Sequence, residues 1–248
     1  MYMKRRLLSW LLVAALAAVA CTQAVSHRAG EAQPVFSPIR YPDQTLILDA
    51  GHGGEDGGAV SLSGAAESGI NLAIVLRMNQ LLGLYGITPV LLRSEDISLH
   101  DSSAQTLREK KVSDLHNRVA AIEAQENATL ISVHQNTFSS TKYHGAQVFY
   151  TNEALSLPFA QLTQDVLRES LDPENTRKPK PIPDSVYLMK HITCRAILVE
   201  CGFLSNPEED QRLQSADYQL QLASALTAAW LQFQTAGDIP PTNEEASR

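Results

Sequence analysis

The feature that most constrains the fold is a regular alternation of short apolar runs with longer segments of helical periodicity. Six runs rich in Val, Ile and Leu predict strands at Thr45–Asp49, Thr88–Leu92, Thr129–Val133, Ala146–Tyr150, Val186–Met189 and Ala196–Val199. Helical spacing of apolar residues predicts helices at Asn71–Tyr85, Leu115–Glu126, Leu157–Leu171 and Ala216–Phe233. Because the strand runs are continuously apolar, both faces of their sheet should be covered. The sequence therefore predicts a single three-layer α/β domain, with a mainly parallel six-stranded sheet flanked by helices.

The N-terminus has the pattern of a segment that directs export. A basic start, Lys4-Arg5-Arg6, precedes the apolar stretch Leu7–Ala20, which ends in small residues typical of a signal-peptide cleavage site. Cys21 follows directly, so a lipid-modified cysteine is a second interpretation. An uncleaved anchor is a third, because about 20 uncharged residues can span a bilayer. All three place the protein outside the cytoplasmic membrane, secreted or tethered, with residues 1–21 as its predicted membrane contact.

The rest of the chain divides into a linker, one domain and a tail. Residues 22–42 are polar with scattered prolines and predict a linker, residues 43–235 hold the periodic segments, and residues 236–248 predict a flexible tail. A length of 248 residues with 44% hydrophobic composition suits one domain with a substantial core. The net charge of −7 argues against a nucleic-acid partner, which needs a basic surface. The long polar loop Ser94–Val112 is either functional or a tolerated surface insertion.

A glycine-rich turn with one histidine ends the first apolar run. The sequence there reads Leu46–Asp49, Ala50 and then Gly51-His52-Gly53-Gly54. Glycines let the backbone turn sharply and leave room beside the imidazole. By itself the turn could be a phosphate cradle, or it could hold a metal or proton-transfer site.

Reactive side chains also follow two other predicted strands. His134 ends the third strand and Glu200 ends the last, while Glu67 lies four residues before Asn71, near the start of the first helix. In open α/β sheets ligands bind outside the carboxyl ends of the strands. We therefore expect these three residues and His52 to converge on one crevice.

Two histidines and one carboxylate are a common ligand set for a catalytic zinc, with the fourth position left to water. A second carboxylate that does not bind the metal can take the proton of that water and pass it to the leaving group. This pattern favours His52, Glu67 and His134 as ligands of Zn²⁺, and Glu200 as the base. The other histidines stay open as alternative ligands: His100, His116, His144 and His191.

Four sequence blocks surround these residues: Leu48–Gly54, Glu67 with Ile70-Asn71-Leu72, Ile131–Asn136 and Leu198–Pro207. In this order and at this spacing they resemble the zinc-dependent N-acetylmuramoyl-L-alanine amidases of the amidase type 3 family. Arg93 and Arg118 also stand where that family often has arginine, and we expect structural roles for both.

The resemblance implies a peptidoglycan hydrolase with one zinc ion. His52, Glu67 and His134 match the zinc ligands of the family, and Glu200 matches its catalytic glutamate. Such an enzyme cleaves the amide between the lactyl group of N-acetylmuramic acid and the L-alanine of the stem peptide. Two alternatives remain: a non-catalytic peptidoglycan-binding or regulatory relative, and another zinc peptidase acting on the stem peptide.

Within the family the chain is most similar to the sporulation and germination branch. Gly145–Tyr150, Lys180–Lys190 and the polar loop carry this similarity. Members of that branch remove stem peptides so that muramic acid can become the muramic-δ-lactam of the spore cortex. The chain shows no wall-binding repeats, so we expect targeting through the cleft, the N-terminus or an activating or targeting protein. Ser94–Val112 is the candidate contact for such a partner.

Overall fold

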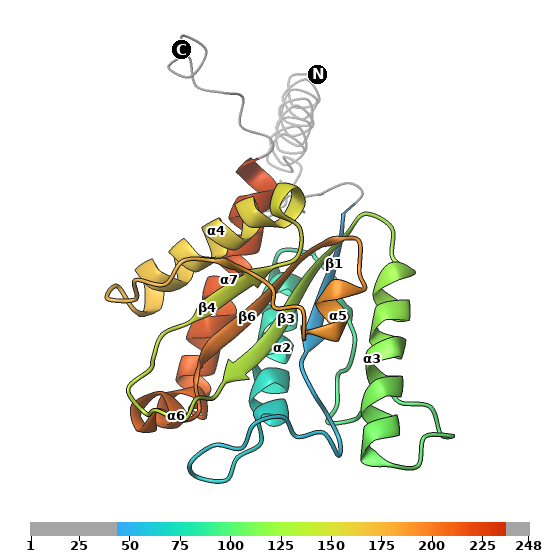
Figure 1. Cartoon of the computed structure of the whole chain (residues 1–248). Coiled ribbons are helices and arrows are strands. Elements are labelled where there is room, and N and C mark those ends of the chain that lie inside the picture. Colours follow the sequence, from blue (N-terminus) through green and yellow to red (C-terminus); the bar gives the residue numbers. More distant parts are fainter. Residues whose placement is uncertain (1–43, 237–248) are drawn as a thin grey trace, which may run out of the picture. The chain divides into compact units, whose positions relative to one another are not determined.

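The computed structural model describes residues 44–236. They form a three-layer α/β domain in which a sheet lies between two layers of helices (Figure 1). The predicted signal peptide or anchor, the linker, and the tail from residue 237 lie outside the described residues. Among the helices of residues 44–236, none has the length and apolar character needed to cross a membrane.

The sheet has six strands in the order β2-β1-β3-β6-β4-β5, which confirms the predicted mainly parallel sheet. Four strands run parallel to one another: β1 (Thr45–Ala50), β2 (Val90–Leu91), β3 (Ala128–Asn136) and β6 (Arg195–Phe203). Beyond β6, β4 (Gln147–Tyr150) pairs antiparallel to it, and β5 (Lys180–Pro181) pairs with β4. The carboxyl ends of β1, β3 and β6 therefore meet at one edge of the sheet.

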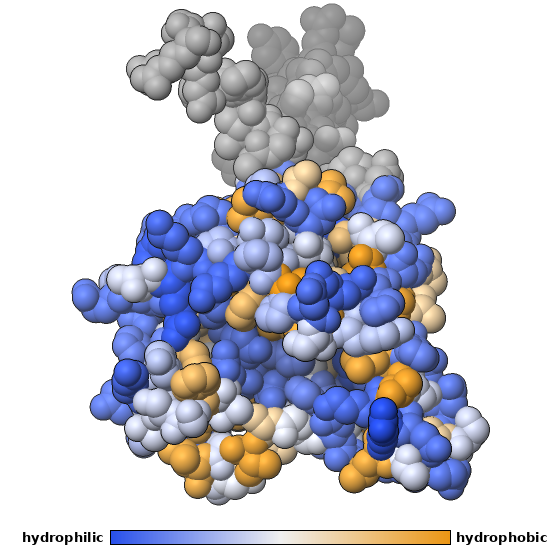
Figure 2. All heavy atoms as spheres, in the orientation of Figure 1, coloured by the Kyte–Doolittle hydropathy of each residue, from blue (hydrophilic) through white to orange (hydrophobic). Residues whose placement is uncertain are grey.

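Helices cover both faces of the sheet, but unequally. On one face α2 (Glu67–Leu84), α4 (Glu153–Leu171) and α7 (Ala216–Ala236) enclose the larger core, with α6 (Pro207–Leu213) at its edge. On the other face α3 (Leu107–Glu123) and the short α5 (Tyr187–Lys190) enclose a smaller core. In Figure 1 these two helices cover only one side of that face, and Figure 2 shows that the middle of the same face is mainly hydrophilic. Beside α3 and α5, this face of the sheet is therefore left without a covering helix of the described residues (Figure 1).

The predicted strand Val186–Met189 is wrong. This segment leads into α5, a single helical turn that buries Leu188 and Met189, and the sixth strand is β5 instead. An apolar run of four residues fits one turn of helix as well as a short strand, so its periodicity cannot decide between them.

Three helices begin earlier than predicted, most clearly α3, which starts at Leu107 instead of Leu115. The Thr106 hydroxyl accepts a hydrogen bond from the backbone N–H of Glu109, and the Glu109 carboxylate accepts one from the backbone N–H of Thr106. This capping box starts the helix on polar residues that carry no apolar stripe. The predicted loop Ser94–Val112 is therefore shorter than expected, and its last six residues belong to α3.

A buried arginine joins α3 to the end of β1. Arg118, 2% exposed, donates hydrogen bonds to the carboxylates of Asp49 and Asp114 and to the backbone carbonyl of His52. Ser132 also donates to Asp49. Burial alone would raise the pKa of Asp49, but the charge of Arg118 and these hydrogen bonds hold it below its usual value. The expected structural role of Arg118 is confirmed, and it fixes the backbone at His52.

Replacing Arg118 with methionine should lower the free energy of unfolding by about 3–5 kcal/mol, because Asp49 would remain buried without its cation. Urea denaturation of the purified protein measures this free energy. Arg108, exposed on the first turn of the same helix, provides the control: R108M should change the free energy by less than about 0.5 kcal/mol. Equal effects of the two substitutions would contradict the assigned role.

Arg93 has the corresponding role between β1 and α2. Its guanidinium donates to the backbone carbonyls of Ala50 (2.8 Å), Gly51 (3.0 Å) and Ser68 (2.8 Å). The arginine is 2% exposed, so these buried carbonyls receive donors that water could not supply. The expected structural role of Arg93 is confirmed, and it holds together the two chain segments that carry predicted ligands.

Candidate active site

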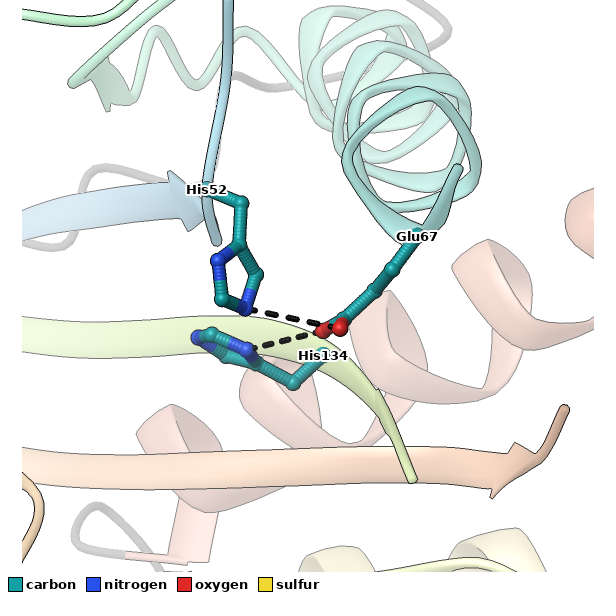
Figure 3. A group of neighbouring side chains, drawn as sticks. All are labelled: His52, Glu67 and His134. Carbon is teal, nitrogen blue, oxygen red and sulfur yellow. Dashed lines mark hydrogen bonds and ion pairs between the residues drawn. The ribbon is translucent and has the colours of Figure 1, made fainter. Parts of the chain in front are cut away.

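Three of the four predicted site residues form one cluster (Figure 3). His52 follows β1, Glu67 is the first residue of α2, and His134 lies near the end of β3. His52 Nε2 lies 3.4 Å from Glu67 Oε2, and His134 Nδ1 lies 3.0 Å from Glu67 Oε1. One ligand atom of each residue lies within 4.8 Å of the other two. The three side chains could therefore share one metal ion.

The glycine-rich turn brings these side chains together. His52 has a φ of +63°, a left-handed conformation that is uncommon outside glycine. A Cβ at Gly51 would lie 2.1 Å from the His134 ring, and a Cβ at Gly58 would lie 2.5 Å from Glu67 Oε2. These two glycines thus leave room for the neighbouring candidate ligands themselves.

A carboxylate that the sequence analysis missed orients the His52 ring. Asp56 Oδ2 lies 3.0 Å from His52 Nδ1, so Nε2 is the ring nitrogen turned toward Glu67. Such a second carboxylate fixes the tautomer of a ligating histidine. Burial alone would lower the pKa of His52, but the hydrogen bond to Asp56 and the contacts with Glu67 outweigh it and raise the pKa to about 9.

Glu67 is 3% exposed and is held by several donors. Its Oε1 accepts from the backbone N–H of Gln135 (3.1 Å) and from Asn71 Nδ2 (3.2 Å), and its Oε2 accepts from the backbone N–H of Ala59 (2.8 Å). Burial would raise the pKa of Glu67, but His134 and His52 hold it well below its usual value. The carboxylate is therefore fixed in place and ionised at neutral pH.

Glu200 lies next to this cluster, on the neighbouring strand. It is directly opposite His134 in the parallel register of β3 and β6. Burial raises the pKa of Glu200 to about 7, with His134 lowering it and Glu67 raising it further. Among the described residues, none donates a hydrogen bond to its buried Oε2. A carboxylate with a pKa near neutrality can both accept and release a proton during a reaction.

The alternative histidines lie outside the cluster. Within residues 44–236, the residues close enough to share a metal ion are His52, Glu67 and His134, and none of the other histidines joins them. His100 contacts Ser98, His144 contacts Asp172, and both His116 and His191 lie against Tyr187.

Two imidazoles and a carboxylate at the carboxyl ends of parallel strands, with a second carboxylate beside them, are typical of metal-dependent hydrolases. Comparison with protein families gives a more specific result. Residues 46–231 match the model of the N-acetylmuramoyl-L-alanine amidase family, amidase type 3, and the chain belongs to this family of peptidoglycan hydrolases.

Individual relatives agree with this assignment. The chain is 36% identical over 197 residues to the germination-specific N-acetylmuramoyl-L-alanine amidase of Bacillus subtilis, which covers 79% of this chain and 82% of the relative. It is 24% identical to the N-acetylmuramoyl-L-alanine amidase AmiA of Escherichia coli, over 77% of this chain and 76% of that protein. The CwlD amidase from Clostridioides difficile, solved in complex with the GerS lipoprotein, has a TM-score of 0.74 and 35% identity, covering 79% of this chain and 100% of that one.

Proposed function

We propose that this amidase uses zinc, held by His52, Glu67 and His134, to cleave the bond between N-acetylmuramic acid and L-alanine, with Glu200 as the general base. The observation that carries the proposal is the cluster of the three candidate ligands, with Glu200 opposite His134 in the β3–β6 register. All four residues come from separate parts of the chain and meet at the open edge of the sheet.

The donor set fits zinc. Tetrahedral zinc with bonds of ~2.0–2.1 Å places its ligand atoms about 3.4 Å apart. Glu67 Oε2 lies 3.4 Å from His52 Nε2 and Glu67 Oε1 lies 3.0 Å from His134 Nδ1, and one ligand atom of each residue lies within 4.8 Å of the other two, which is near enough for the three residues to share an ion. Asp56 also supplies the carboxylate that commonly accompanies a zinc-bound histidine.

The residues around the cluster have distinct tasks in the reaction. Zinc bound in such a site lowers the pKa of a water molecule and polarises the carbonyl of the substrate amide. Glu200 accepts the proton of the attacking water and delivers it to the nitrogen of the leaving L-alanine. Before zinc binds, burial raises the pKa of Glu200 to about 7, a range in which a carboxylate can both accept and release a proton.

We further propose a role in the spore cortex, outside the cytoplasmic membrane, where removal of stem peptides precedes formation of muramic-δ-lactam. One relative is named germination-specific, and the solved CwlD amidase is bound to a lipoprotein. The complex supports an activating or targeting protein partner here too, with residues 94–112 as its candidate contact. A deletion strain that still makes normal cortex lactam would overturn this role.

The decisive experiment for the activity is a peptidoglycan digest with the purified protein, with products identified by mass spectrometry. We expect free stem peptides that begin with L-alanine and glycan strands with unsubstituted muramic acid. A chelator should abolish them and added zinc should restore them. Peptides cut within the stem would identify a different peptidase, and binding without products would identify a non-catalytic relative.

Zinc uptake should release a proton at neutral pH. Without zinc, the hydrogen bonds to Asp56 and Glu67 raise the pKa of His52 to about 9, and only the neutral imidazole binds zinc. The affinity for zinc should therefore rise about tenfold per pH unit from pH 6 to pH 8.

Calorimetry in two buffers of different ionisation enthalpy counts the protons released on zinc binding. D56N removes the main partner that raises the pKa of His52, so it should release fewer protons. A buffer-independent enthalpy in the unaltered protein would contradict this linkage.

A further inference from the structure

A groove lined by aromatic and basic side chains lies beside the candidate active site, on the side of β4 and β5. Its volume is about 320 Å³, and its lining includes Phe138, Tyr143, Phe149, Phe203, Arg177 and Lys180. We call it the aromatic groove. The ring centroids of Phe138 and Tyr143 are 4.9 Å apart in an edge-to-face arrangement, so these two rings pack against each other on one side of the groove.

The groove borders the candidate catalytic residues along one row of the sheet. Glu200 of β6 is opposite His134 of β3 on one side and opposite Gln147 of β4 on the other. Gln147 lines the aromatic groove. Directly opposed residues on paired strands hold their side chains on the same face. A substrate whose scissile amide lies at His134 and Glu200 can therefore extend over Gln147 into the groove.

Gln147 presents an acceptor that its neighbours leave unsatisfied. The side chain is 2% exposed, and its Nε2 donates to the backbone carbonyl of Lys178 (2.6 Å). Within residues 44–236, no donor reaches its buried Oε1. A buried acceptor without a donor is costly, and a ligand in the groove that brings an N–H group would satisfy it once the Gln147 amide turns to present Oε1.

The two cations of the groove are free to bind an anion. Arg177 is fixed by the backbone carbonyl of His144, to which its Nε donates (3.0 Å), and by the Phe203 ring, 4.9 Å from its guanidinium carbon. Within the described part of the chain, no carboxylate forms an ion pair with Arg177 or Lys180.

A second cleft lies on the other side of the cluster, between α3 and α5. It differs from the aromatic groove in the pairing of its cations. Its two cations are already neutralised: Lys111 pairs with Asp56 at 3.2 Å, and Arg118 pairs with Asp49 and Asp114. The two flanks of the candidate active site therefore differ in their capacity to bind an anion.

From these observations we propose that the aromatic groove is the subsite for the peptide side of the substrate. Arg177 and Lys180 bind a free carboxylate of the stem peptide, and Gln147 Oε1 accepts a hydrogen bond from a peptide N–H. The proposal rests on the proposed amidase function. The lactyl carboxyl of the muramic acid is consumed in the scissile amide, so the free carboxylates of the substrate lie on its peptide side. The glycan then lies toward the cleft between α3 and α5.

The test compares two soluble disaccharide-peptide substrates, one with free peptide carboxylates and one with the same groups converted to carboxamides. The unaltered enzyme should cleave the carboxylate form with a kcat/KM about tenfold higher, mainly through KM, because charge-assisted hydrogen bonds are lost in the carboxamide. The double variant R177Q/K180Q should cleave both substrates equally, at the rate of the carboxamide form. K180Q alone, at an exposed position, should lose part of the preference without affecting folding.

Arg77 provides the matched control, because it is half-buried on α2 and donates to the backbone carbonyl of Ala73 within its own helix. R77Q should keep the full preference. An unaltered enzyme without preference would overturn the subsite while leaving the amidase function intact. The subsite would also be overturned if the double variant lost the same factor of kcat/KM with both substrates, since the groove would then bind the neutral glycan. Failure to cleave either substrate would instead contradict the amidase function itself.

Discussion

Replacement of Glu200 with glutamine should abolish amide hydrolysis while leaving the zinc content unchanged. Glutamine keeps the size of the side chain but cannot accept a proton from water. General acid–base catalysis contributes about 10²–10⁴-fold, and here one residue serves both proton transfers. We therefore expect kcat to fall by at least about 10³-fold. Chromatography of the released L-alanine peptides measures the rate. Inductively coupled plasma mass spectrometry measures the bound zinc.

Glu208 offers a matched control for this substitution. It is exposed on the first turn of α6, eight residues after Glu200, so E208Q should keep both zinc and activity. An E200Q protein with near-normal activity would refute the assigned base. An E200Q protein that has lost its zinc would instead make Glu200 a ligand, and the division of roles among the four residues would be wrong.

The convergence of His134 and Glu200 is predictable from sequence because it depends on simple rules. Both residues end apolar runs, and parallel strands bring their carboxyl ends to the same edge of the sheet. The observed register, which pairs His134 with Glu200 directly, adds the detail that the pattern alone does not contain. Glu67 joins them because α2 begins at this residue, four positions earlier than its apolar stripe indicates.

Asp56 and the aromatic groove depend on features that periodicity does not encode. Asp56 reaches His52 because the chain reverses through a residue with a positive φ. In sequence, an aspartate among glycines reads as an ordinary turn residue. Gln147 and Arg177 reach the site through the antiparallel strand β4 and the segment before β5, whose position in the sheet no apolar run determines. Sequence therefore predicts the cluster of candidate metal ligands better than it predicts the residues that line the aromatic groove.

Replacement of His52 with glutamine should weaken zinc binding by roughly a hundredfold. Structural zinc sites with four ligands bind with about 10–16 kcal/mol, so one ligand accounts for about 3 kcal/mol. Activity should be lost at trace zinc and should return in part as zinc is raised, whereas added zinc should not restore E200Q. Titration with a fluorescent zinc competitor measures the affinity, and the peptide-release assay follows the activity at each zinc concentration.

The control for this substitution is His116, one of the alternative ligands considered from sequence. It is exposed and lies against the ring of Tyr187. H116Q should bind zinc normally, since His116 is outside the cluster of candidate ligands. Equal losses of zinc in H52Q and H116Q would show that the metal is bound elsewhere. Opposite responses of H52Q and E200Q to added zinc would separate the role of holding the metal from the role of moving the proton.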